Sequence, residues 1–103
     1  IKEITIPHKE KYSNHVYHQY TMKIEESKRD QLKSYLSDFN IPSMIYYPIP
    51  LYNQKAFSSY YDGPGLKNTE ALCKQVLSLP MHTEMDNEIQ YFIINKIKDF
   101  FKK

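Results

Sequence analysis

Several residue types that would define a class of protein are scarce in this sequence. It has no tryptophan, two glycines and a single cysteine, Cys73, among 103 residues. One cysteine excludes an internal disulfide and is typical of a reducing compartment, so we expect a cytoplasmic protein. No apolar run approaches the roughly 20 residues that a membrane-spanning helix needs, and we therefore expect no membrane partner.

Net charge is also small. Lysine and arginine outnumber aspartate and glutamate by 14 to 12, which gives +2 and does not predict nucleic acid as a partner. RNA-recognition sheets carry aromatic residues within a glycine-containing motif, whereas both glycines here, Gly63 and Gly65, lie in one predicted turn.

The histidines do not predict a metal site. His15 and His18 lie three residues apart on a predicted strand and would face opposite ways, so we expect that they cannot bind one metal ion together.

The composition and the periodicity indicate one packed domain. Hydrophobic residues make up 41% of the chain and aromatic residues 15%, enough for one core in a chain of this length. Alternation over residues 15–24 predicts a strand whose inward face carries His18. Two further strands are expected, at residues 3–6 and 43–47, and a short helix at 53–60. A longer helix is expected to begin at its cap Ser27 and to stop at Asn40, and another to run from 68 or 69 to 79 with Val76 and Leu79 in its apolar stripe. The final helix is expected to be capped by Asp86 and to face the core with Ile89, Phe92, Ile93, Ile97, Phe100 and Phe101.

This order of strand, helix, strand and further helices predicts an α+β fold, with helices packed on a small, mostly antiparallel sheet. The most distinctive segment is the corner Tyr46-Tyr47-Pro48-Ile49-Pro50-Leu51-Tyr52. Each proline removes a backbone donor and disfavours the helical conformation of the residue before it. We therefore expect a stiff, extended corner that presents polar aromatic side chains, either to a ligand or to the core.

Three ordered motifs carry a resemblance to a known family. They are His15 to Thr21, Ile41 to Phe57, and Glu70 to His82. Together they resemble the C-terminal small domain of the DegT/DnrJ/EryC1/StrS aminotransferases, over roughly residues 12 to 101. The resemblance implies an aminotransferase small-domain fold for residues 15–103. It also implies that residues 1–14 are a linker from a missing upstream domain that binds pyridoxal phosphate.

The resemblance also implies a function for the complete enzyme. It would transfer an amino group from glutamate to a nucleotide-linked keto sugar, as a homodimer. The cofactor-binding lysine motif of the family is absent here, so we expect no catalytic residue, no bound cofactor and no activity in this chain alone. The alternative is a stand-alone binding or interaction module on the same scaffold.

The corner supplies the candidate substrate-binding residues Tyr46, Tyr47 and Tyr52. The family corner usually reads His-Tyr-Pro-x-Pro-Leu-His, so tyrosine stands at both histidine positions, 46 and 52, and provides neutral phenols there. Because neighbours on an extended segment point to opposite sides, we expect Tyr46 to face the substrate cleft and Tyr47 the core. We also expect an exposed apolar patch near the first strand and the corner.

Overall fold

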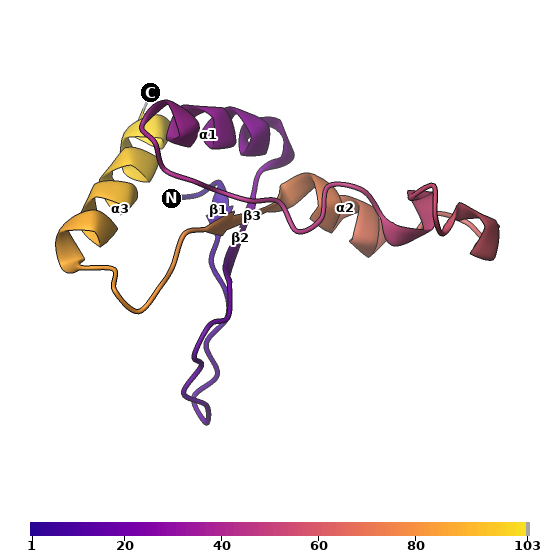
Figure 1. The fold of residues 1–103 in the computed structure, drawn as a ribbon, viewed down its shortest axis with the longest axis horizontal. Helices are drawn as coiled ribbons and strands as arrows, with labels where there is room; N and C mark the ends of the chain where they lie inside the picture. The colour runs from indigo at the N-terminus through magenta and orange to yellow at the C-terminus, as the bar shows by residue number, and fades with distance from the viewer. Residues whose placement is uncertain (103) are drawn as a thin grey trace.

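The structure is a computed structural model that describes residues 1–102, and Lys103, the last residue of the predicted small domain, lies outside them. It has the predicted α+β fold, in which a three-stranded antiparallel sheet of order β1-β2-β3 is accompanied by three helices (Figure 1). The strands are β1 Ile4–Thr5, β2 Tyr20–Ile24 and β3 Val76–Leu79, and the helices are α1 Glu26–Asp38, α2 Lys67–Gln75 and α3 Asn87–Lys102.

The core forms where α1 and α3 meet the sheet. Leu32 and Leu36 of α1 and Leu77 of β3 are completely buried. The other core side chains come from β2, α3 and the segment after α1, and they are Met22, Ile24, Ile41, Ile93 and Ile97. The short strand expected at residues 3–6 is present as β1 and pairs with β2 through Ile4 and Ile24. The role of residues 1–14 as a linker remains a prediction.

One predicted helix is too long. The helix expected to reach residue 79 ends at Gln75, and Val76–Leu79 form the strand β3. Met22 lies opposite Leu77 in the β2–β3 ladder. A short apolar run fits a buried strand as well as a helix, and pairing with β2 decides between them. The assignment of Val76 and Leu79 to a helical stripe was therefore wrong.

Two predicted strands are shorter or absent. The strand expected over residues 15–24 begins only at Tyr20, which lies opposite Leu79 at the end of β3. Pro80 follows Leu79 and has no N–H to continue the ladder, so residues 15–19 form a loop. The strand expected over residues 43–47 is reduced to an isolated bridge between Met44 and Ser78, and Pro42 and Pro48 on either side limit any extension.

The helix ends follow the sequence only in part. Asn40 has a φ of 57° and stops α1 as predicted, while Asp86 Oδ1 accepts the Ile89 N–H at 2.7 Å and caps α3. Ser27 lies inside α1 and is not its cap, because the helix begins one residue earlier, at Glu26. In α3 the predicted inward residues Ile89 and Phe92 are each 45% exposed. The helix expected at 53–60 is replaced by two single 3₁₀ turns, η1 Leu51–Asn53 and η2 Ser58–Tyr60.

Two extensions project from this core (Figure 1). One is the loop that leads into β2, and the other contains α2 and the segment before it. The radius of gyration is 15.8 Å, compared with about 13 Å for a compact domain of this size. None of the helices within residues 1–102 is both long and apolar enough to span a membrane.

Candidate functional site

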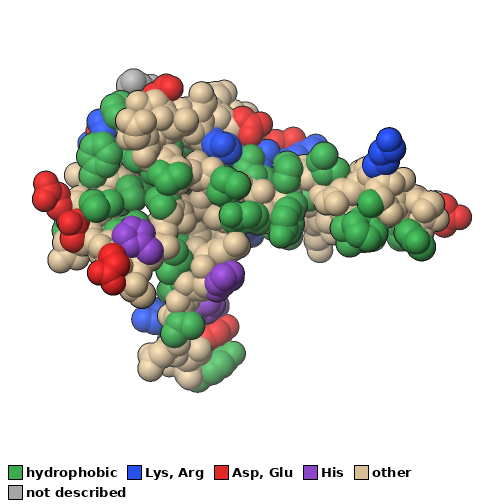
Figure 2. Space-filling model, viewed as in Figure 1, with side chains coloured by type: hydrophobic (Ala, Val, Ile, Leu, Met, Phe, Trp, Pro, Cys, Tyr) green, Lys and Arg blue, Asp and Glu red, His purple; other side chains and the backbone are tan. Residues whose placement is uncertain are grey.

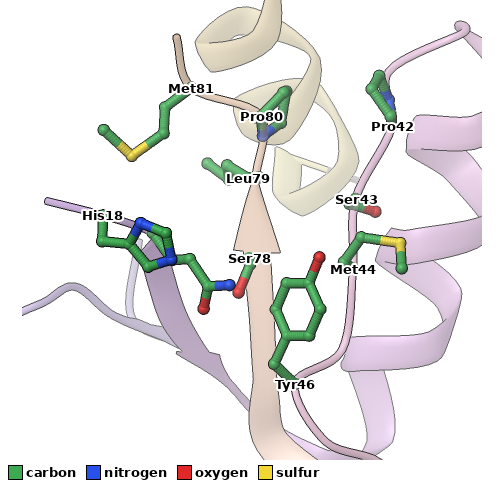
Figure 3. Close-up of a pocket in the computed structure, with 10 residues that line it drawn as sticks. His18, Pro42, Ser43, Met44, Tyr46, Ser78, Leu79, Pro80 and Met81 are labelled. Carbon is green, nitrogen blue, oxygen red and sulfur yellow. The ribbon is translucent and has the colours of Figure 1, made fainter.

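A pocket of about 320 Å³ lies where the loop before β2, the corner and the end of β3 meet (Figure 3). It is called the polar pocket here after its five polar side chains, although more of its lining is apolar than polar. Its polar lining comes from His18, Gln19, Ser43, Tyr46 and Ser78. In Figure 3 His18 and Tyr46 lie on opposite sides of β3. The remaining walls are apolar and consist of Pro42, Met44, Leu79, Pro80 and Met81.

The floor of this pocket is fixed by hydrogen bonds to β3. Met44 N–H donates to the Ser78 carbonyl at 3.0 Å, and Ser78 N–H donates to the Met44 carbonyl at 2.7 Å. The Ser78 hydroxyl also lies 2.8 Å from Thr21 Oγ1 on β2. Ser78 is 4% exposed, so β3 supports the start of the corner with a buried, fully paired contact.

Tyr46 and Tyr47, the two adjacent tyrosines of the corner, do not lie one toward the cleft and one in the core. Tyr46 is 38% exposed and Tyr47 is 68% exposed. Their rings contact each other edge to face, with centroids 5.7 Å apart, so they do not point to opposite sides of an extended segment. The prediction that Tyr47 packs into the core was therefore wrong. Tyr46 lines the polar pocket. Together with Tyr47 it also lines a neighbouring, mostly apolar groove of about 260 Å³ between the corner and α2, and Tyr47 does not line the polar pocket.

Tyr52 is held by contacts within the chain. Its hydroxyl donates to Glu70 Oε1 at 2.9 Å and accepts the Leu66 N–H at 3.1 Å, while its ring lies 5.1 Å from that of Tyr61. The Leu66 bond lowers the pKa of Tyr52, but partial burial and the Glu70 carboxylate outweigh it and raise that pKa above 10. A role for Tyr52 in substrate binding remains a prediction.

The burial predicted for His18 was wrong. It is exposed and lines the polar pocket, whereas the alternation predicted a core histidine. Pro80 was the overlooked signal, because it ends β3 and leaves residues 15–19 without a strand partner. His15 accepts the Tyr17 N–H at Nδ1. Within residues 1–102 no three His, Cys, Asp or Glu side chains are grouped so that they could hold a metal.

The lysines that the structure describes lie at or near the surface. None of those within residues 1–102 is buried, and none lines the polar pocket. Lys74 pairs with Glu26 at 3.1 Å and Lys102 with Asp99 at 3.5 Å. Cys73 is half-buried and faces the apolar groove under the corner.

Two curated relatives match most of this chain. A pleiotropic regulatory protein from Geobacillus stearothermophilus is 42% identical over 90 residues, which are 85% of this chain and 23% of that protein. A UDP-N-acetyl-3-dehydro-alpha-D-glucosamine 3-aminotransferase from Acidithiobacillus ferrooxidans is 40% identical over 75 residues, which are 73% of this chain and 20% of that protein. This chain therefore spans about a quarter or less of the length of these relatives.

Solved structures confirm the fold over nearly all of this chain. A DegT DnrJ EryC1 StrS aminotransferase from Brucella abortus has a TM-score of 0.86 and 36% identity, over 99% of this chain and 27% of its own. NtdA from Bacillus subtilis, solved with the bound cofactor PMP, has a TM-score of 0.83 and 28% identity, over 98% of this chain and 23% of its own. The model of one family matches residues 1–98. The chain belongs to the DegT/DnrJ/EryC1/StrS aminotransferase family, whose members depend on pyridoxal phosphate.

Proposed function

We propose that this chain is the C-terminal domain of an enzyme that transfers an amino group from glutamate to a nucleotide-linked keto sugar. The observation that carries the proposal is the polar pocket on the corner of a chain whose family match covers residues 1–98. The pocket is open, is lined by Tyr46, and combines hydrogen-bonding groups with apolar walls, as sugar sites do. In the complete enzyme this surface forms one wall of the substrate cleft.

Tyr46 and its neighbours in the pocket would bind and orient the sugar. A phenol both donates and accepts a hydrogen bond, and so matches sugar hydroxyls of either polarity. Gln19 adds an amide, and His18 adds an imidazole whose ring nitrogens can donate or accept a hydrogen bond. Met44 and Met81 provide flexible apolar surface that would exclude water from the ring. Tyr47 is proposed as a second contact at the outer rim.

Pyridoxal phosphate would supply the electron-withdrawing ring on which transamination depends. The residues of this chain do not fit a site for it, because no lysine within 1–102 is buried or lines the pocket. We therefore assign the cofactor and the catalytic lysine to a large domain upstream, and we expect this chain to be inactive without that domain. The complete enzyme is proposed to be a cytoplasmic homodimer.

The exposed apolar surface supports a place within a larger protein. Around the corner and the loop before β2, the side chains of Val16, Met44, Tyr47, Ile49 and Leu51 are between 51% and 90% exposed. Figure 2 shows apolar side chains along the extension that contains α2. The apolar patch expected near the corner is therefore present, and we propose that the large domain or a second subunit covers it.

The substrate class is proposed to be a UDP-linked 3-keto sugar. The relative from Acidithiobacillus ferrooxidans is named for such a sugar, and the Tyr-Tyr-Pro corner resembles the branch of the family that acts on UDP-linked 3-keto sugar acids. The test is to incubate the full-length protein with glutamate and either UDP-linked or dTDP-linked keto sugars. Formation of 2-oxoglutarate with a UDP-linked 3-keto sugar supports the proposal. If none of the nucleotide sugars receives an amino group, the proposal is contradicted.

A further inference from the structure

Hydrogen bonds to other segments hold the corner at its two ends, and Ile45, which precedes Tyr46, packs against the core. At the upstream end Met44 and Ser78 exchange two backbone hydrogen bonds. Within residues 1–102 no backbone hydrogen bond joins residues 45–49 to any other segment. Beneath them lies the groove of about 260 Å³ that separates the corner from Thr69, Leu72 and Cys73 of α2. The position of Tyr46 therefore depends on the packing of Ile45 and on what holds the downstream end of the corner.

Tyr52 holds that end. Its hydroxyl donates to Glu70 in the first turn of α2 and accepts the N–H of Leu66, the residue that precedes this helix. One phenol thus joins the 3₁₀ turn after the corner to the start of α2. The Glu70 carboxylate lies in the first turn of α2, near the positive end of the helix dipole, and a carboxylate oxygen is a strong acceptor for a phenol O–H.

The turn before α2 leaves space for this contact. A Cβ added at Gly65 would overlap Glu70 Oε1, the oxygen that accepts from Tyr52. The backbone at Gly65 does not have a positive φ, so alanine is compatible with its conformation. Glycine at this position therefore keeps the carboxylate in place for Tyr52, and alanine would displace the carboxylate without removing any hydrogen-bonding group.

We propose that the contact among Tyr52, Glu70 and the Leu66 N–H, here called the clasp, positions the corner so that Tyr46 faces the sugar. Glu70 and Tyr52 are then positioning residues that act through Tyr46. This inference rests on the proposed function. It adds a residue, Glu70, that is outside the corner and does not line the polar pocket.

The test uses the full-length protein with variants that break the clasp in three ways. Tyr52→Phe removes the hydroxyl, Glu70→Leu removes the acceptor, and Gly65→Ala displaces it. Glu70→Gln is the conservative variant, because its amide oxygen still accepts from Tyr52. The matched controls are on α3, where Tyr91 is 63% exposed and Glu88 is exposed in the first turn; they are Tyr91→Phe and Glu88→Leu.

If the clasp positions the corner, breaking it should change KM for the sugar nucleotide and not KM for glutamate. Each clasp-breaking variant should raise KM for the sugar nucleotide about 3- to 10-fold, which corresponds to the free energy of one hydrogen bond. KM for glutamate should stay within about twofold of the wild-type value. The double variant Tyr52→Phe with Glu70→Leu should be no worse than either single variant. Glu70→Gln and the α3 controls should behave as wild type. If Glu70→Leu does not fold, Gly65→Ala and Tyr52→Phe decide the outcome.

Hydrogen exchange of the Asn53 and Gln54 amides, which donate to the Pro50 and Leu51 carbonyls in the turn that carries Tyr52, gives a readout that does not depend on activity. The clasp-breaking variants should speed this exchange, and the α3 controls should not. Unchanged exchange in folded Tyr52→Phe and Gly65→Ala would overturn the clasp. Faster exchange with an unchanged KM for the sugar nucleotide would show that the contact holds the corner but does not serve the substrate, which also overturns the proposal. If the wild-type protein transfers no amino group to any sugar nucleotide, the proposed function is refuted. Hydrogen exchange would then test only whether the clasp holds the corner.

Discussion

Arg29 of α1 donates from Nη1 to the carbonyl oxygen of Val76, 3.2 Å away, at the point where α2 gives way to β3. The same nitrogen is 3.1 Å from the carbonyl of Cys73, one of the terminal carbonyls of α2 that lack a partner within the helix. Arg29 is only 7% exposed. Its Nε lies 2.7 Å from Asp30 Oδ1 but makes no well-directed hydrogen bond. The arginine thus ties the helix-to-strand junction to α1.

We predict that Arg29→Met destabilises the protein by about 1–3 kcal/mol, because two carbonyls at the junction lose a charged donor. Methionine retains much of the apolar contact, so the loss reports on the hydrogen bonds. Unfolding in urea measures the change, and Lys98→Met on the exposed face of α3 is the control. Equal stability of Arg29→Met and wild type would show that desolvation of the guanidinium cancels its hydrogen bonds.

The raised pKa of Tyr52 predicts a stability change in alkaline solution. The folded state favours the neutral phenol, which donates to Glu70, so this contribution to stability is fully present below the unfolded pKa of about 10. It is lost as the pH rises through the higher folded pKa. The stability difference between wild type and Tyr52→Phe should therefore shrink above pH 10. A difference that stays constant across this range would contradict the assigned hydrogen bond.

We further predict that pyridoxal phosphate labels the lysines of this chain without selectivity. The lysines within residues 1–102 are exposed or half-buried, and none has an enclosed pocket that would favour one adduct over the others. Borohydride reduction followed by mass spectrometry should find low, scattered modification. A single stoichiometric and saturable adduct at one lysine would contradict the assignment of the cofactor to another domain.

The family and the fold class could be predicted from the sequence because several signals agree. Ordered motifs mark the family, and capping by Asp86 and the stop at Asn40 are local effects that residue type decides. The boundary between α2 and β3 could not be predicted in the same way. Val76 and Leu79 satisfy a helical stripe and a buried strand equally well, and only the ladder with β2 distinguishes the two.

The candidate site was predicted in part. The corner was identified by Pro48 and Pro50, whose effect on the backbone is local. The contact between the Tyr46 and Tyr47 rings and the exposure of His18 depend on how three distant segments meet. Glu70 went unnoticed because its partner is 18 residues away, and nothing in the sequence links them.

The measurement that tests the account most directly compares Tyr46→Phe and Tyr47→Phe in the full-length protein. Both side chains are at least 38% exposed, so neither variant should lower the melting temperature appreciably. Tyr46→Phe should weaken sugar-nucleotide binding about 2- to 12-fold, since one hydrogen bond contributes roughly 0.5–1.5 kcal/mol, and Tyr47→Phe should have a smaller effect. Wild-type affinity in both variants would contradict the assignment of the corner as a wall of the substrate cleft.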